Sequence, residues 1–444
     1  MKSEPSVSRS DHLRRYEEGR IARAAQATPT LCWDRALGTR VWDVDGREYI
    51  DFTSGVLVMA AGHGHPRITQ AITTQAQRLV NCYASPHPLR SQLADALLEI
   101  AGHPFDRAIF VTTGSEAIDT SLKIARHMTG RPGVITFSGA FHGRTLGGVS
   151  VSGTGSTRRG IGTPVSDIVR APFPYPYRWE FGEPVADTAL ALTEWAAETV
   201  GVDQIGAILI EPFLGAGGVL PAPPSFVTGL QALADRIGAL LIFDEIQSGL
   251  GRCGHWFNYQ GLGVIPDIVV GSKALGGGLP ITAVMGRSEL LDRMPPGSMT
   301  STFGGNPLAC AAGLATLQVL KDENLVSNAT EVSRIMLNEM RAWVGTVPAV
   351  GDVRGVGLSF GVELVSDLET KVPDSSRATA VVSAVWDEGL VVLPPAGEYG
   401  NVVRFAPPLS ISAEEAVDGL GRLRRALEYT SRAAEDRHAI YAER

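Results

Sequence analysis

The chain has 444 residues, of which 44% are hydrophobic and 19% are charged, and its formal net charge is -8. This is the balance of an ordinary soluble globular protein with a sizeable core, and the length favours two or three domains. The acidic excess leaves no electrostatic footprint for nucleic acid or for an anionic membrane surface, so small-molecule chemistry is the favoured class of function.

The N-terminal twenty residues are charged and polar where a signal peptide would be apolar, and no apolar run is long enough to span a membrane. We therefore expect a cytoplasmic protein. The four cysteines are far apart in the chain and lack the spacing of a zinc site. They predict reduced, structural thiols and no bound metal.

The first predicted element is a β-hairpin from Arg40 to Phe52, which turns at Asp45-Gly46. From about Ser91 onward, helices alternate with apolar strands at residues 108–111, 133–137, 205–212, 239–245 and 266–273. Such strands predict a parallel sheet that is covered by helices on both faces. The loop-rich span from Gly153 to Pro184 is too long for a simple connection and is a candidate functional loop.

The C-terminal part begins with a helix from about Pro307 to Lys321, followed by a polar helix, a strand pair around residues 353–364 and a last helix from about Ala413. We predict an α/β protein whose large domain has a mostly parallel sheet, with a smaller α+β domain beside it. The predicted division is an N-terminal segment 1–62 that packs with the small domain, a large domain 63–322 and a small domain 323–444.

Three predicted strands end at residues that could bind a ligand or take part in catalysis. Parallel sheets bind their ligands at the carboxyl ends of the strands. Gly114 and Ser115 open a helix whose free N–H groups suit a phosphate, although Ser115 could simply cap the helix. Asp244 ends an apolar strand, where a carboxylate is costly to bury unless it meets a cation or a strong hydrogen-bond donor, although it could simply form an ion pair at the strand end. Lys273 ends another such strand, where desolvation would lower its pKa and make it a nucleophile toward a carbonyl, or where it could snorkel to the surface.

Together these groups match the three parts of pyridoxal phosphate (PLP), namely its phosphate, its pyridine nitrogen and its aldehyde. In that hypothesis Asp244 keeps the ring nitrogen protonated, while Lys273 forms the imine and later carries the proton. A dinucleotide site is the alternative from another class. It would need a glycine fingerprint after the first strand, and the segment TTGSEA does not supply one.

Seven segments resemble, in family order and spacing, the signatures of the class III aminotransferases, a family that includes 4-aminobutyrate and ornithine aminotransferases. They are TTGSEAIDTSLKIAR, FHGRT, IEPFLGAGG, LLIFDEIQSGLGRCG, DIVVGSKALGGGLP, STFGGNPLAC and RFAPPL. The resemblance runs from the hairpin to the last helix. It implies fold type I, PLP as cofactor, and transfer of an amino group from an amino acid or ω-amino compound to 2-oxoglutarate or pyruvate.

The resemblance also implies roles for single residues of the cofactor site. Lys273 matches the family's Schiff-base lysine and Asp244 matches the partner of the pyridine nitrogen. Gln247 matches the residue near the ring hydroxyl, and Ile246 matches the apolar contact on one ring face.

Phe141 stands at the stacking position of the family and His142 follows it, while Gly114 and Ser115 match the phosphate loop. Thr302 matches a phosphate contact that the neighbouring subunit supplies. This last match implies a homodimer with shared active sites.

Two arginines match the substrate-binding positions of the family. Arg404 matches the residue that receives a substrate carboxylate, and Arg144 matches the one used for the distal carboxylate of glutamate and 2-oxoglutarate. Many relatives carry a glutamate where this chain has Ala216, and that glutamate neutralises the arginine when it is unwanted. Without it, Arg404 stays available throughout the cycle. Glu211 of the same motif is present and could pair with Arg144.

The segments DFTSG, VRAPFPYPYR and GDVRGVGL also resemble the dialkylglycine decarboxylases of the same class. That subgroup has a glutamine directly after DFTSG and a tryptophan before HG, where this chain has Val56 and Phe141. The polar group beside the scissile carboxylate is thus absent, so Val56 is expected to face the substrate and transamination is favoured over decarboxylation. Amino-acid racemases of the class are a further alternative.

Overall fold

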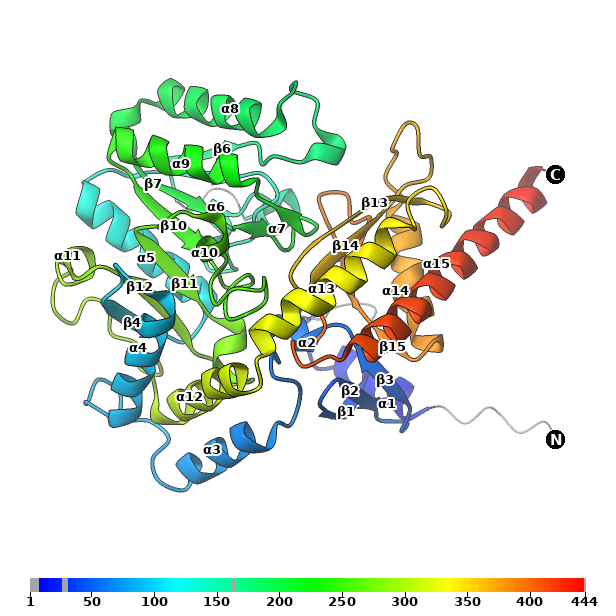
Figure 1. The fold of residues 1–444 in the computed structure, drawn as a ribbon, viewed down its shortest axis with the longest axis horizontal. Coiled ribbons are helices and arrows are strands. Elements are labelled where there is room, and N and C mark those ends of the chain that lie inside the picture. Colours follow the sequence, from blue (N-terminus) through cyan, green and yellow to red (C-terminus); the bar gives the residue numbers. More distant parts are fainter. Residues whose placement is uncertain (1–7, 26–30, 162–164, 443–444) are drawn as a thin grey trace.

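The computed structural model describes residues 8–25, 31–161 and 165–442. The predicted segment 1–62 and the predicted loop 153–184 therefore each include residues outside the described part. Figure 1 shows a larger lobe built around a sheet, and a second lobe that contains elements from both ends of the chain. Among the described helices, none is both long and apolar enough to cross a membrane.

Seven strands form the central sheet of the larger lobe, in the order β4, β12, β11, β10, β7, β5, β6 (Figure 1). Their bounds are Arg107–Val111 (β4), Gly133–Phe137 (β5), Ile168–Ala171 (β6), Ile205–Ile210 (β7), Leu240–Asp244 (β10), Ile268–Gly271 (β11) and Thr282–Gly286 (β12). Strands β5, β7 and β11 are buried at every residue. The continuous apolar runs of the sequence are therefore explained by cover on both faces.

Two strands depart from the expectation. The short strand β6 lies within the span predicted as a loop, and it extends the sheet by pairing in parallel with β5. Strand β12 was not predicted, and it is antiparallel to both β11 and β4. The connection from Gly271 to Thr282 contains only a single 3₁₀ turn (Lys273–Gly276). It is too short for a parallel crossover, so the chain returns in the opposite direction.

Side chains alternate across the sheet and meet different helices on its two faces. Ala207 and Leu209 of β7 pack in one cluster with apolar residues of α5 (Gly114–Thr129). Ile208 and Ile210 point the other way, into the main core that includes α9 (Pro224–Ile237). The period of two along β7 thus joins both layers of helices to one sheet.

The second lobe joins the two ends of the chain through small sheets. Strands β1 (Trp33–Leu37), β2 (Arg40–Asp43) and β3 (Glu48–Asp51) continue into β15 (Leu390–Val391), which pairs with β3 in parallel. The predicted hairpin is present, with Gly46 at a φ of 90° in its turn. An antiparallel sheet has the order β13 (Val350–Val356), β14 (Ser359–Leu364), β17 (Val402–Phe405), β16 (Leu393–Ala396).

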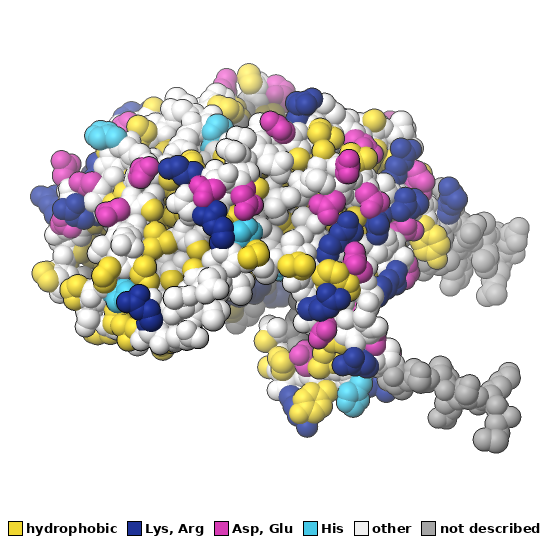
Figure 2. Space-filling view, turned by 60° about the horizontal axis from the view of Figure 1, so that its bottom comes forward, with side chains coloured by type: hydrophobic (Ala, Val, Ile, Leu, Met, Phe, Trp, Pro, Cys, Tyr) yellow, Lys and Arg dark blue, Asp and Glu magenta, His cyan; other side chains and the backbone are white. Residues whose placement is uncertain are grey.

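The other elements surround these sheets. Besides α5 and α9, the helices of ten residues or more are α1 (Arg9–Glu18), α3 (Pro66–Ala76), α4 (Pro88–Ala101), α8 (Val185–Val200), α12 (Pro307–Asp322), α13 (Leu325–Arg341), α14 (Ser375–Asp387) and α15 (Ala413–Ala442). Shorter elements are α2 (Ser54–Leu57), α6 (Leu146–Val151), α7 (Gly155–Arg158), α10 (Asn258–Leu262), α11 (Ser288–Leu291), β8 (Phe213–Leu214) and β9 (Leu220–Pro221). Figure 2 shows positive and negative side chains interspersed over the face in view.

A buried group of charges fastens the two lobes together, and we call it the Glu363 cluster: Glu363, Arg354, Arg178 and Tyr175. Glu363 of β14 accepts hydrogen bonds from Tyr175, from Arg178 at 2.5 Å and from Arg354 at 2.7 Å. Tyr175 and Arg178 belong to the span predicted as a functional loop. Burial alone would raise the pKa of Glu363, but its arginine and tyrosine partners lower it below the ordinary value. This part of the loop therefore fastens the lobes.

Candidate active site

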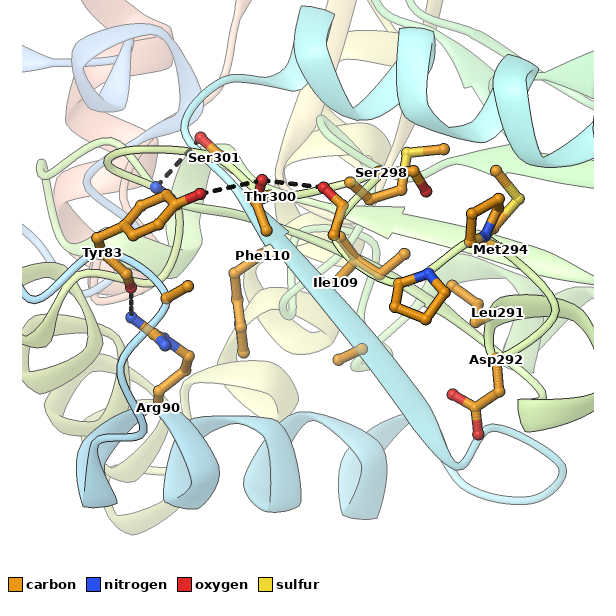
Figure 3. Close-up of a pocket in the computed structure, with 17 residues that line it drawn as sticks. Tyr83, Arg90, Ile109, Phe110, Leu291, Asp292, Met294, Ser298, Thr300 and Ser301 are labelled. Atoms are coloured by element: carbon orange, nitrogen blue, oxygen red, sulfur yellow. Dashed lines mark hydrogen bonds between the residues drawn. The ribbon is translucent and has the colours of Figure 1, made fainter.

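A cavity of about 210 Å³ lies where β4, β5, β10 and β11 end. It is lined by Thr113, Gly114, Ser115, Phe141, His142, Gly143, Asp244, Ile246, Gln247, Ser272 and Lys273. The lining includes every residue that the sequence predicted for the cofactor except Thr302. A larger pocket of about 560 Å³ surrounds Tyr83 and Thr300 (Figure 3), but neither Lys273 nor Asp244 lines it.

Lys273 lies two residues beyond the end of β11 and begins a 3₁₀ turn, with a φ of 20°. Its Nζ donates to the carbonyl oxygen of Val56 at 3.3 Å. Burial, together with the positive charge of Arg404, lowers the pKa of Lys273 to about 8 against the opposing effect of Asp244 and Glu211. A neutral amine is therefore accessible near neutral pH, as nucleophilic attack on a carbonyl requires.

Asp244 is the last residue of β10 and only 4% of it is exposed. Its Oδ2 lies 2.7 Å from Nδ1 of His142, and its Oδ1 accepts a hydrogen bond from the amide of Ile246 at 3.1 Å. His142 is itself buried. The carboxylate is thus held from two directions while it lines the cavity, which fixes where it can meet a positively charged ring nitrogen.

The opposite end of the cavity is the start of α5. Thr113 caps this helix, and Glu116 completes a capping box with it. The first amides of a helix have no partner inside the helix, and the helix dipole favours an anion at this end. The hydroxyl of Ser115 accepts the backbone N–H of Arg144 at 3.0 Å, which joins this helix to the loop after β5.

Glycines allow the walls of the cavity to approach closely. A Cβ atom on Gly114 would lie 2.6 Å from the side chain of Ile246, and one on Gly143 would lie 2.2 Å from Oγ of Ser115. A Cβ atom on Gly215 would lie 2.2 Å from Oε1 of Gln247. Any larger residue at these three positions would displace a wall of the cavity.

Arg404 lies on β17 and is partly buried, with its Nε out of reach of solvent. No ion pair joins it to a carboxylate among the described residues, and its Nε has no hydrogen-bond partner there. Burial lowers the pKa of Arg404 to about 10, with Glu211 opposing that effect. An unpaired buried cation is costly, so this side chain can gain much from an incoming carboxylate.

Glu211 does not make the ion pair with Arg144 that the sequence suggested. Its carboxylate instead accepts backbone N–H groups, from Phe141 at 2.7 Å and from Gly215 at 3.1 Å. Burial raises the pKa of Glu211 to about 7, against the opposing charge of His142. The amides satisfy this carboxylate locally, which explains why a distant arginine is not needed.

Arg144 lies at the mouth of the site. Its guanidinium carbon is 5.6 Å from the centre of the Phe141 ring, within the range of a cation–π contact. The residue is exposed. A second, accessible positive charge therefore stands beside the stacking aromatic residue.

Val56 belongs to a short segment that we call the Val56 turn, residues 53–57. Ser54, Val56 and Leu57 all have φ between 49° and 65°, a left-handed conformation that is strained for non-glycine residues and above all for a β-branched valine. Asp51 holds the start of the turn by accepting the N–H and the hydroxyl of Thr53. In this conformation the carbonyl oxygen of Val56 accepts the hydrogen bond from Nζ of Lys273, and Val56 is 47% exposed.

Thr302 is not in the cavity of its own chain. It lines a separate pocket of about 420 Å³ beside the first turns of α5, together with residues 298–303. Its neighbour Phe303 is 60% exposed. Thr302 is thus separated from the cofactor-site residues with which the sequence grouped it.

Three residues of the lining were not predicted: Thr113, Gly143 and Ser272. Thr113 could have been found, because threonine followed three residues later by Glu116 is the pattern of a capping box. Gly143 and Ser272 are adjacent in sequence to the predicted His142 and Lys273, but only their position in space shows that they reach the cavity.

The residues of this cavity fit PLP. The amine of Lys273 makes one contact, to a carbonyl, and has no carboxylate partner among the described residues. Asp244 supplies an anion that is already oriented, and the start of α5 supplies donors for a phosphate. An amine, an anion and hydrogen-bond donors for a phosphate therefore converge on one cavity, whose walls approach closely at glycine residues.

Comparison with known proteins gives consistent matches over nearly the whole chain. The family model for class III aminotransferases matches residues 21–427. The 4-aminobutyrate aminotransferase of Escherichia coli K12 is 36% identical over 87% of this chain and 91% of its own length. The leucine/methionine racemase of Thermococcus litoralis is 36% identical over 88% of this chain and 89% of its own. The structure of an ornithine aminotransferase from Toxoplasma gondii, described with PLP at its active site, has a TM-score of 0.85 and 30% identity, and covers 97% of this chain and 96% of the other.

Proposed function

The chain belongs to the class III aminotransferases, which are PLP-dependent enzymes of fold type I, and we propose that Lys273 is its Schiff-base lysine. The enzyme moves an amino group from an amino acid or ω-amino compound to a 2-oxo acid. The observation that supports this lysine most directly is its position, at a strand end in the same cavity as Asp244 and the start of α5.

PLP, when bound, withdraws electrons from the carbon that bears the substrate's amino group and holds that group between the two half-reactions. Asp244, oriented by His142, would keep the ring nitrogen protonated. Gly114 and Ser115 would bind the phosphate, while Phe141 and Ile246 would pack against the two faces of the ring.

Lys273 would also move the proton at the substrate carbon. Its lowered pKa suits this role, because a base works best when its pKa lies near the working pH. The carbonyl of Val56, 3.3 Å from Nζ, would hold the amine in place while it is free. Gln247 would lie beside the ring hydroxyl. The backbone of Gly215 packs closely against the Gln247 side chain.

We propose that Arg404 receives the α-carboxylate of the amino donor. Its guanidinium is partly buried and has no carboxylate partner among the described side chains, so a bidentate carboxylate would satisfy it. Ala216 offers no competing charge at the position where many relatives carry a glutamate. This favours donors that carry a carboxylate next to the amino group. Arg144 would bind the distal carboxylate of 2-oxoglutarate.

We also propose a homodimer in which Thr302 of each subunit completes the phosphate site of the other. Thr302 lies outside its own cavity, in a segment with exposed apolar residues. The adjacent larger pocket, with Tyr83 hydrogen-bonded to Thr300 at 3.4 Å, continues this surface (Figure 3). Mixing Lys273→Ala protein with Thr302→Ala protein tests this: restored activity in the mixed dimer is expected. A monomer by sedimentation would exclude it.

The assay for the proposed donor and acceptor uses a panel of α-amino acids and ω-amines against 2-oxoglutarate and pyruvate. We expect the highest kcat/KM with an α-amino acid donor and 2-oxoglutarate. Chiral analysis of the donor reports racemisation, and carbon dioxide release reports decarboxylation. A donor that changes configuration or loses carbon dioxide faster than it loses nitrogen would contradict transamination. Cytoplasmic location remains a prediction from the sequence.

A further inference from the structure

Arg252 is a buried cation of unusual surroundings. Only 2% of the residue is exposed, and no carboxylate lies within ion-pair distance of it among the described residues. Burial lowers its pKa to about 10, with Cys253 and Asp51 opposing that effect. Burying a guanidinium without a counter-ion is costly, so the contacts it makes in return need an explanation.

Those contacts join three separate segments of the chain. Nη1 donates to the carbonyl oxygens of Leu358 at 2.8 Å and of Pro407 at 2.6 Å, and Nη2 donates to the hydroxyl of Ser54 at 3.4 Å. Ser54 in turn donates to the carbonyl of Ala406 at 2.6 Å. One planar guanidinium thus links the β13–β14 turn, the segment after β17 and the start of the Val56 turn.

Two of the linked segments bear on the active site. The Val56 turn presents its carbonyl to Lys273, and β17 carries Arg404 only a few residues before Pro407. Arg252 itself lies in the loop that follows Asp244 and β10. The strained left-handed backbone of residues 54–57 persists only if its surroundings hold it, and Arg252 is one of the groups that do so.

We propose that Arg252 is a positioning residue, which sets the place of the Val56 carbonyl and of the Arg404 strand relative to Lys273. This rests on the proposed roles of Lys273 and Arg404. Arg252 touches neither cofactor nor substrate and acts through the residues it holds. The two terminal nitrogens of its planar guanidinium reach three acceptors. The donors of a lysine all leave from one nitrogen, so they cannot reproduce this geometry.

The charge of Arg252 has a second effect on the same amine. The charged groups that face Lys273 are Arg404 and Arg252, which both lower its pKa, and Asp244 and Glu211, which raise it. Loss of the Arg252 charge therefore moves the ionisation of Lys273 to higher pH. A variant that keeps the charge but loses the fork separates positioning from electrostatics.

The test uses Arg252→Lys, Arg252→Met and Ser54→Ala in the full-length enzyme. Arg131→Lys is the matched control, because Arg131 also donates to two backbone carbonyls, those of Ile205 and Ile237, away from the cavity. Melting temperatures are measured with kinetics. A readout independent of activity is the rate at which cofactor-free protein takes up PLP between pH 7 and 10, with borohydride trapping at Lys273 to confirm the attachment point.

We expect Arg252→Lys to raise KM for the carboxylate-bearing donor about tenfold, with a smaller change in kcat, because several hydrogen bonds to a charged group are lost. Ser54→Ala should raise KM less, in the same direction. Arg252→Met should move the pH midpoint of PLP uptake upward, while Arg252→Lys leaves it in place. Arg131→Lys should alter neither quantity.

The inference is overturned if Arg252→Lys and Arg131→Lys lower the melting temperature alike and both leave KM unchanged, and if Arg252→Met leaves the pH midpoint of PLP uptake in place. If Arg252→Lys does not fold, the KM of Ser54→Ala decides in the same way. Failure of the proposed function gives a different result, namely covalent PLP uptake or transamination that survives in Lys273→Ala.

Discussion

The Glu363 cluster and the cavity of Lys273 both bury several charges, but they pair them differently. In the cluster, Arg354 and Arg178 each meet the carboxylate of Glu363. Lys273, which lines the cavity, and Arg404 of β17 have no carboxylate at ion-pair distance among the described residues. A buried charge that has a counter-ion helps to hold a structure together, whereas one that has neither a counter-ion nor a full set of hydrogen bonds is available to a ligand. The comparison therefore distinguishes the Glu363 cluster, which connects the two lobes, from the cavity of Lys273, which can bind a ligand.

The largest effect should come from Lys273. Replacement by alanine removes both the covalent attachment of PLP and the base, so we expect kcat to fall by at least ~10³-fold. Lys321→Ala is the control, since that exposed lysine pairs with Glu99 at 3.8 Å and has no part in the catalytic role proposed for Lys273. Transaminase kinetics and borohydride mapping are the measurements. Activity within tenfold of the parent would remove Lys273 from the mechanism.

The Glu363 cluster should respond in stability. Glu363→Gln leaves Arg354 and Arg178 without their shared buried carboxylate, which should cost about 3 kcal/mol of unfolding free energy. Urea unfolding measures this. Glu388→Gln breaks only the more exposed contact with Arg425 and should cost less than about 1 kcal/mol. Equal losses of unfolding free energy in the two variants would show that the Glu363 cluster does not stabilise the contact between the lobes.

Arg404→Lys should change substrate selection. A lysine keeps the charge but loses the bidentate fork, so kcat/KM for carboxylate-bearing donors should fall about tenfold or more. Simple amines without a carboxylate should be affected little. Arg354→Lys, in the cluster, should lower stability and leave this ratio as it is. An equal fall for amines with and without a carboxylate would argue against Arg404 as the carboxylate receptor.

The smallest effect is an opposite pH response of two buried glutamates. Burial raises the pKa of Glu211 to about 7, so the stability it contributes is present below its unfolded pKa of about 4.3 and is lost as pH rises to 7. The partners of Glu363 lower its pKa, so its contribution is present above that unfolded value and is lost as pH falls through the folded pKa. Urea unfolding of cofactor-free Glu211→Gln and Glu363→Gln at several pH values should show these opposite slopes relative to the parent. Parallel slopes would contradict the assignment.

The sequence located the residues that lie at strand ends, because an apolar run that stops at a polar residue is a local pattern. Lys273 and Asp244 were found in this way. The resemblance to the family added Arg404, Phe141 and Thr302, which no local pattern singles out. Predicted elements such as β5 and α5 coincide with the structure because their burial repeats along the chain.

What the sequence could not give is pairing between distant segments. Tyr175 and Glu363 are 188 positions apart, and Arg252 and Pro407 are 155 apart, so neither contact leaves a spacing that can be read. The same reason explains β6, whose four residues become a strand only beside β5. Glu211 was assigned the wrong partner because backbone amides, which carry no sequence signature, satisfied its carboxylate first.

The parallel pairing of β15 with β3 ties residues near the end of the chain to residues near its beginning. A ribosome releases the N-terminus first, so the early hairpin must wait for Leu390 to be synthesised before its sheet can close. Lys273 and Asp244 leave the ribosome well before Arg404. A nascent chain thus contains the residues that we propose for cofactor binding before it contains the arginine that we propose for substrate selection.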